Sequence, residues 1–157
     1  MSVPETTIEA DPNVPIIRIT REFAAPPDKV FRAHVEPELI VQWLGPKDLV
    51  MTLDRWECRT GGAYRYVHTR GDDEFGFHGC FHDVRPDERI VQTFTWEGEP
   101  DGVALETLEL EDLGGGRTRL TIRSLVESFE IRDAILASGM EHGVVEGYEK
   151  LDALLAS

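Results

Sequence analysis

The sequence predicts a single α+β domain: an antiparallel sheet of about seven strands, two short helices after the first strand, and a long C-terminal helix. Three observations carry this prediction. Strand-like segments separated by turn residues fill the middle of the chain, helical periodicity occupies its last part, and short helical patterns follow the first strand. With 157 residues, the chain has the length of one domain.

The N-terminal region divides into a tail and a strand. Residues 1–13 contain Glu5, Glu9 and Asp11 but no basic residue. We therefore expect a disordered acidic tail over 1–13 and a folded domain over 14–157. From Ile16 to Phe23 apolar and polar residues alternate, which is typical of a half-buried strand.

Two short helices are expected next. Pro27 suits the first turn of a helix and Asp28 suits the positive end of its dipole, so a helix begins here and ends before Pro37. A second short helix follows and stops at Gly45-Pro46.

The middle of the chain consists of six predicted strands. Turn residues such as Gly61-Gly62 and Gly114-Gly115-Gly116 separate them, so consecutive strands should pair as antiparallel hairpins. The predicted strands cover residues 49–58, 63–70, 75–84, 89–97, 103–112 and 117–125.

Residues 129–156 are expected to form one long helix. Met140, Gly143, Gly147 and Leu151 share one side of it. Each glycine costs a helix about 1 kcal/mol relative to alanine. The two glycines therefore indicate a close approach of this helix to another part of the molecule, which we expect to be the sheet.

Charge and composition exclude several classes of partner. The net charge is -14, so nucleic acids and anionic membrane surfaces should be repelled. No apolar run approaches the roughly 20 residues that a membrane span needs. Cys58 and Cys80 form no CxxC pair, and the first residues lack the features of a signal peptide, so we expect a cytoplasmic location.

A series of short motifs runs from about Val14 to the C-terminus. They are Ala25-Pro26 with Val30-Phe31, Trp43-Leu44-Gly45-Pro46, Gly61-Gly62-Ala63-Tyr64-Arg65-Tyr66, Glu106-Thr107, Gly116 with Thr118 and Leu120, and Ser138-Gly139-Met140 with Gly143. In this order they resemble the START-like helix-grip domains of the SRPBCC superfamily, and within it the domain related to the activator of the heat-shock protein 90 ATPase. The resemblance implies a curved sheet folded around the C-terminal helix. Members of the superfamily include lipid and hormone binders, polyketide cyclases, toxin-sequestering resistance proteins and chaperone activators, so the fold does not select a function.

Alternation along the strands predicts which side chains face the space between the sheet and the last helix. Large aromatic residues with a few polar groups are typical of a small-molecule cavity, although the same pattern also fits an ordinary core. Polar groups on this face favour the cavity, because they need water or a ligand as a partner. The candidate ligand-binding residues are Trp43, Met51, Tyr64, Tyr66, Gln92, Phe94, Trp96, Glu106, Met140 and Val144.

Two features of the sequence could take part in chemistry: a single carboxylate on an apolar face and a group of possible metal ligands. A carboxylate on an apolar face has a raised pKa, so Glu106 is a candidate acid or base, unless it lies at the mouth of the strand in water or beside an arginine. His78, Cys80 and His82 share one face of a strand, as zinc ligands would. Phe75, Phe77 and Phe81 occupy the opposite face and suit the interior better, so the His-Cys-His face should point outward. We expect no metal and no cofactor.

We therefore expect a protein that binds a small apolar or amphipathic molecule in an internal cavity, with homodimer formation left open and no catalytic residue assigned. Two alternatives stand beside this interpretation. One is an enzyme similar to polyketide cyclases or aromatases, with Glu106 and a tyrosine as its acid–base pair. The other is a chaperone-binding module, which an exposed apolar patch on the outer face of the sheet would favour.

Overall fold

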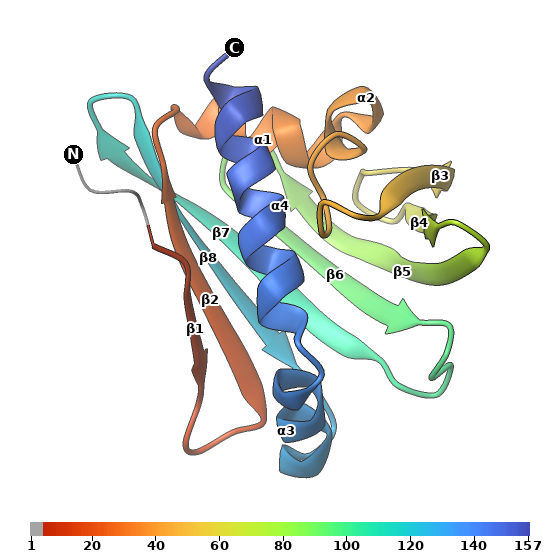
Figure 1. The fold of residues 1–157 in the computed structure, drawn as a ribbon. Helices are drawn as coiled ribbons and strands as arrows, with labels where there is room; N and C mark the ends of the chain where they lie inside the picture. The colour runs from red at the N-terminus through yellow and green to blue at the C-terminus, as the bar shows by residue number, and fades with distance from the viewer. Residues whose placement is uncertain (1–4) are drawn as a thin grey trace.

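The computed structural model describes residues 5–157 and contains one antiparallel sheet of eight strands with four helices (Figure 1). The strands are β1 (Thr7–Ala10), β2 (Ile16–Phe23), β3 (Val50–Trp56), β4 (Ala63–Arg70), β5 (Asp73–Arg85), β6 (Arg89–Trp96), β7 (Ala104–Gly114) and β8 (Arg117–Leu125). The helices are α1 (Pro27–Val35), α2 (Pro37–Ile40), α3 (Phe129–Ala137) and α4 (Met140–Leu155).

The strands follow the order β1-β2-β8-β7-β6-β5-β4-β3. From β3 to β8, each strand pairs with the next one along the chain, as the turn residues predict. The β2–β8 pair joins the early and late parts of the chain. The sheet is curved, and α4 runs across its inner face, with α1 and α2 at one end of the molecule and α3 at the other (Figure 1). This is the helix-grip architecture.

The N-terminal segment contains a strand that the sequence does not predict. Thr7–Ala10 forms β1 and pairs with β2 over four residue pairs, from Thr7↔Thr20 to Ala10↔Ile17. The turn between them is fixed by the Asp11 carboxylate, which accepts a hydrogen bond of 2.8 Å from the Asn13 backbone N–H. The prediction of a disordered tail over 1–13 is therefore wrong for this strand, which raises the number of strands from seven to eight; residues 1–4 of that tail lie outside the described residues. Backbone pairing at an open sheet edge outweighs the low hydrophobicity of the segment.

The C-terminal helix is divided into two. Gly139 adopts a left-handed conformation with φ of 87° between α3 and α4, which ends one helix and begins the other. The expectation of one continuous helix over 129–156 is corrected by this break. The sequence feature that indicates this break is the Ser138-Gly139 pair, because a serine followed by a glycine is typical of the end of a helix.

The α1 and α2 region follows the sequence prediction closely. Pro27 occupies the first turn of α1 and Pro37 that of α2, and Asp28 lies at the N-terminal end of α1. Two tryptophan indoles donate hydrogen bonds to backbone carbonyls at the C-terminal end of α1. The N–H of Trp43 donates to the Ala33 carbonyl at 2.9 Å, and that of Trp56 to the Val35 carbonyl at 2.8 Å.

The two glycines of α4 face a loop and not the sheet. A Cβ at Gly147 would lie 3.1 Å from the Trp43 carbonyl oxygen and 3.3 Å from the Gly45 nitrogen. A Cβ at Gly143 would lie 3.4 Å from Pro46 Cδ. The close approach expected at these positions is therefore real, but the partner is the backbone after α2. The expectation that the helix contacts the sheet through them is wrong.

Candidate ligand-binding site

A row of polar side chains crosses the inner face of the sheet on three adjacent strands. Gln92 on β6 lies opposite Glu106 on β7, and Glu106 lies opposite Ser124 on β8. The Gln92 amide donates a hydrogen bond of 3.2 Å to Glu106 Oε1. All three side chains are half-buried. Glu106 therefore lies within the sheet, and neither the solvated strand mouth nor an arginine partner considered from the sequence applies to it.

The protonation of Glu106 is set by its surroundings. Burial raises the pKa of its carboxyl above the ordinary range, and the contacts with Ser124 and Gln92 act in the opposite direction. The negative charge of Glu106 also contributes to raising the pKa values of Tyr64, Tyr66 and Tyr148, in which burial is the larger cause. The carboxyl group therefore has three tyrosines within the range of its electrostatic field.

The three tyrosine hydroxyls differ in how they are paired. The Tyr64 hydroxyl donates a hydrogen bond of 2.6 Å to the Thr93 carbonyl. The Tyr66 and Tyr148 hydroxyls form no hydrogen bond with any of residues 5–157, and neither oxygen is completely enclosed by protein. Both side chains are otherwise buried. Two unpaired hydroxyls, one from the sheet and one from α4, are thus available to another molecule.

Aromatic rings form the apolar part of the same face. The Tyr66 and Phe77 rings are stacked with centroids 5.2 Å apart, and the Phe77 and Phe94 rings with centroids 5.4 Å apart. Tyr64 stacks on Tyr66 at 6.0 Å. This places Tyr64, Tyr66 and Phe94 in one continuous aromatic surface across β4, β5 and β6.

Side chains at the start of α4 and on the facing part of the sheet are partly exposed. Met140 and Val144 on α4, and Phe94 on the sheet, are half-buried, whereas Leu151 farther along α4 is completely enclosed. The helix is therefore packed tightly against the sheet at its C-terminal end and less tightly near its start. A separate small cavity of about 10 Å³ lies beside α1, lined by Phe31, His34, Arg89, Ile90, Leu108, Leu110 and Leu120.

Trp43 and Met51 belong to the core. Both are buried, and Trp43 lies 4.8 Å from His34 and 6.1 Å from Tyr148, measured between ring centroids. The indole N–H of Trp43 is already paired with the Ala33 carbonyl. These two residues support the site through Tyr148 and β3 and present no free polar group to it.

Three residues of this face are missing from the sequence-based set. Tyr148 follows Val144 at helical spacing, Ser124 continues the alternation of Leu120 and Ile122, and Phe77 is placed inside by its strand but is absent from the list of site residues. Extending the helical pattern from Val144 to Tyr148 and the strand pattern from Ile122 to Ser124 would have found two of them, and Phe77 needed only to be added to the site residues from the inward face already assigned to it.

The comparisons with known proteins agree with this architecture. The family description that matches residues 24–156 is "Activator of Hsp90 ATPase homolog 1-like protein". The chain belongs to this family. No match was found among curated proteins.

Solved structures similar to this AHSA1-like protein cover nearly its whole length. A crystal structure of a protein from Rhodobacter sphaeroides is 30% identical, with a TM-score of 0.85 over 97% of this chain and 98% of that chain. A solution structure of a protein from Arthrobacter aurescens is 28% identical, with a TM-score of 0.86 over 96% of this chain and 91% of that chain. The AHSA1 protein from Silicibacter pomeroyi, at 22% identity and a TM-score of 0.73 over 90% of this chain and 97% of that chain, shares the fold.

The outer face of this AHSA1-like domain carries the His-Cys-His group. His78, Cys80 and His82 are all exposed, whereas Phe77 and Phe81 pack in the core. The predicted orientation of this strand is therefore confirmed for these residues. Within residues 5–157, no three His, Cys, Asp or Glu side chains are grouped so that they could hold a metal ion. Nor does any helix in that range have the length and apolar character needed to cross a membrane.

Trp96 departs from its predicted place. Its backbone lies opposite Phe77 at the end of β6, but its side chain is 42% exposed and lies against Gly98 in the following turn. It lines an open groove together with outward-facing residues of β4, and Phe75 lines the same groove. Trp96 therefore belongs to the outer surface, because β6 ends there and the turn redirects the ring. Phe75 lies opposite the buried His68 near the start of β5 and is only half-buried, so it borders the groove instead of packing in the core as Phe77 and Phe81 do.

The rest of the outer face is mixed. Arg119 pairs with Glu111 at 3.1 Å and Arg123 with Glu109 at 3.3 Å across β7 and β8. Beyond these pairs, Leu105 and Leu125 lie directly opposite each other, 43% and 38% exposed. An apolar cross-strand pair at one end of a charged face is a small patch, and singly exposed apolar residues are normal on protein surfaces.

Proposed function

We propose that this protein binds a small apolar or amphipathic molecule between α4 and the inner face of the sheet. The observation that carries the proposal is the pair of unpaired hydroxyls of Tyr66 and Tyr148. Both hydroxyls belong to otherwise buried side chains beside one aromatic surface, and a ligand or water that reaches them would complete their hydrogen bonds.

The chemistry of the face defines the kind of ligand. The stacked rings of Tyr66, Phe77 and Phe94 offer an apolar surface for a flat or branched hydrocarbon body. The hydroxyls can donate to an acceptor such as a carbonyl, ether or hydroxyl oxygen. Glu106 and Gln92 add a second polar contact on the inner face of the sheet. A neutral molecule with one polar end fits this arrangement, because an anion would meet the field of Glu106 and of the net charge of -14.

Matched tyrosine variants test the proposal. Tyr66→Phe and Tyr148→Phe each remove a hydroxyl that has no partner among residues 5–157, so the free energy of unfolding should stay nearly constant. Tyr64→Phe removes the hydrogen bond to Thr93 and should lower it by about 1 kcal/mol. In titrations with the neutral dye Nile red, the first two variants should bind about two- to tenfold more weakly, which corresponds to one lost hydrogen bond each.

The result that would contradict the proposal is equal dye affinity in wild type, Tyr66→Phe and Tyr148→Phe. Native mass spectrometry of freshly purified protein supplies an independent measurement, because a co-purified small molecule would appear as an added mass that organic extraction removes.

An enzyme remains a second candidate because burial raises the pKa of Glu106. A carboxylic acid with a raised pKa keeps its proton to a higher pH than an ordinary glutamate and can act as a general acid, and Tyr66 or Tyr148 could complete an acid–base pair as in polyketide cyclases or aromatases. Turnover of a cyclisable polyketide analogue that Glu106→Gln abolishes would establish this activity. Cys58 and Cys80 are both unpaired, and we propose a cytoplasmic location on that ground.

A further inference from the structure

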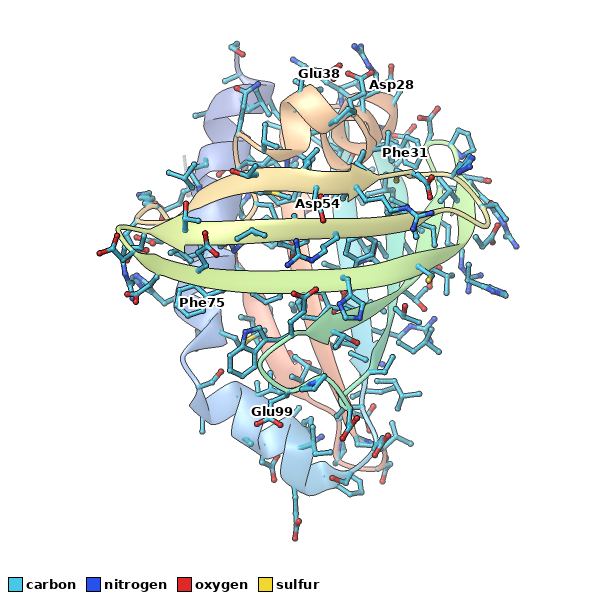
Figure 2. The ribbon with its side chains drawn as sticks, turned by 90° about the vertical axis from the view of Figure 1, so that its right-hand side faces the viewer. Asp28, Phe31, Glu38, Asp54, Phe75 and Glu99 are labelled. Carbon is cyan, nitrogen blue, oxygen red and sulfur yellow. The ribbon has the colours of Figure 1, made fainter. Side chains whose placement is uncertain are left out.

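A groove on the outer face of the sheet is independent of the site proposed above. It has a volume of about 420 Å³. It is lined by the ion pair of Arg65 and Glu97, by Glu74 and the glycines at 76 and 98, and by the apolar side chains of Val67, Phe75 and Trp96. Figure 2 shows this face, with Phe75 beside β5 and Glu99 on the turn below it. The groove is open to solvent, which suits a segment of a polypeptide chain better than an enclosed small molecule.

Two glycines fix the side chains that shape the groove. A Cβ at Gly76 would overlap Glu97 Oε1, and a Cβ at Gly98 would overlap the Trp96 indole. Glu97 lies over Gly76 and accepts hydrogen bonds from Arg65 at 2.8 and 2.9 Å. His78 Nδ1 lies 2.9 Å from the same carboxylate. These contacts lower the pKa of Glu97 to about 2, so it is ionised, and its position is set before any partner arrives.

The floor of the groove is apolar and partly uncovered. Val67 and Phe75 are half-buried, and Trp96 is 42% exposed with an indole N–H that donates to none of residues 5–157. The other two tryptophans direct their indole N–H groups to carbonyls of α1. An exposed tryptophan beside an apolar floor is typical of the centre of a protein-binding surface.

The rim of the groove is acidic. Asp72 and Glu74 lie at the β4–β5 turn, and Glu99 and Asp101 at the β6–β7 turn; none of the four forms an ion pair with another described residue. The basic side chains nearby are engaged, because Arg65 pairs with Glu97 and Asp54, and Arg70 with Asp48. Unpaired negative charge is therefore present at Glu74 in the groove and in the two turns that adjoin it.

We propose that this groove binds a basic segment of a partner protein in an extended conformation. An apolar side chain of the segment lies on Val67 and Phe75. A lysine or arginine next to it lies over the face of Trp96, where a cation is attracted by the ring, with the carboxylates of the rim around it. The net charge of -14 draws such a segment to the surface and repels phosphate-bearing ligands.

The test uses the ¹⁵N-labelled full chain and the acetylated, amidated peptide Leu-Lys-Arg-Leu-Lys. During titration the indole N–H resonance of Trp96 should shift, while those of Trp43 and Trp56 stay in place. A peptide of the same length with glutamate at each basic position should cause no shift. Movement of no indole resonance at millimolar basic peptide would overturn the proposal.

Variants separate a specific groove from general attraction to an acidic protein. Trp96→Ala should weaken peptide binding about tenfold or more, as loss of a central tryptophan does. Glu74→Gln in the groove should weaken it severalfold, whereas Glu38→Gln, an exposed carboxylate of α2 at the far end of the molecule (Figure 2), should leave it unchanged. Val67→Lys places a positive charge on the floor and should abolish binding, with the circular dichroism spectrum and Tm confirming that each variant is folded. Equal weakening by Glu74→Gln and Glu38→Gln, with no effect of Trp96→Ala, would show non-specific charge attraction and refute the groove.

Discussion

Arg21 on β2 and Asp152 on α4 form an ion pair that connects the inner face of the sheet to the last helix. Arg21 Nη1 lies 3.1 Å from Asp152 Oδ1, and the same nitrogen donates to the Glu22 carbonyl at 2.7 Å. The guanidinium lies over the Phe23 ring at 4.9 Å and near the Tyr148 ring at 6.0 Å. This contact therefore positions Tyr148, whose hydroxyl belongs to the proposed binding site.

The two ends of this pair should respond differently to substitution, because Arg21 is 3% exposed and Asp152 is 37% exposed. Asp152→Ala leaves a buried cation without its partner and should lower the free energy of unfolding by about 2–3 kcal/mol. Arg21→Met leaves the Asp152 carboxylate, which water can reach, and should lower the free energy of unfolding by about 1 kcal/mol. Urea denaturation measures both. As a control, Lys47→Ala in the exposed Lys47–Glu149 pair should change it by less than about 1 kcal/mol. A larger loss for Arg21→Met than for Asp152→Ala would contradict this account.

The glycines of α4 should also respond differently. At Gly143 an added Cβ meets Pro46 at ordinary contact distance, so Gly143→Ala should gain about 0.5–1 kcal/mol of stability from helix propensity. At Gly147 it meets backbone atoms of Trp43 and Gly45 at 3.1 and 3.3 Å, so Gly147→Ala should gain nothing or lose stability. Gly147→Leu should lose about 1–3 kcal/mol from overpacking. Thermal unfolding compares the Tm values of the three variants. If Gly147→Ala raised the Tm as much as Gly143→Ala does, the backbone at Trp43 and Gly45 would have to move away from the new Cβ without a cost in stability, which would contradict this account.

Strand periodicity predicted the inner face well where the strands are regular. Tyr64 and Tyr66, and Gln92 opposite Glu106, lie where alternation places them, because a period of two is fixed by backbone geometry. The same rule places Arg21 between Ile19 and Phe23 on the inner face, where a charged side chain contradicts the apolar pattern. Its partner is 131 residues away, and no local pattern contains that information.

The wrong predictions arise where an element ends. Trp96 has inward parity, but the chain turns at Glu97–Glu99, with the Glu99 N–H donating to the Trp96 carbonyl at 2.9 Å, and the ring lies over Gly98. Strand β1 forms because the edge of β2 is open, a property of the assembled sheet. Likewise, the glycines of α4 revealed a close contact but not which element makes it.

Stability should depend on pH through Glu106. Its pKa is raised in the folded state, above the ordinary value of 4.5, so the folded protein holds this proton to a higher pH than the unfolded chain does. Unfolding then releases a proton in the window above pH 4.5, and a rise in pH through that window lowers stability. Glu106→Gln keeps an acceptor for Gln92 and removes the ionisation. The variant should be more stable than wild type at neutral pH, and the difference should disappear below the ordinary glutamate pKa. Urea denaturation at pH 4, 5.5 and 7 measures the difference in the free energy of unfolding between Glu106→Gln and wild type. A difference that stays constant across these pH values would contradict a raised pKa of Glu106.

The space beside Met140 can be probed by filling it. Met140 is half-buried near the start of α4, and Leu151 on the same helix is completely enclosed. Met140→Trp places a larger ring where water already reaches and should change the free energy of unfolding by less than about 1 kcal/mol. Leu151→Trp forces the same ring into closed packing and should lower it by about 1–3 kcal/mol or more.

Dye binding completes this comparison, because Met140→Trp should occupy the place of the ligand and weaken Nile red binding while the fold stays intact. Gly143→Ala, one turn farther along α4 and facing the loop, serves as the matched control and should leave dye affinity unchanged. If Met140→Trp destabilises the protein as much as Leu151→Trp does, the space beside Met140 is already closed. A ligand between α4 and the sheet would then have to displace side chains to enter, and the hydroxyls of Tyr66 and Tyr148 would be completed by water alone.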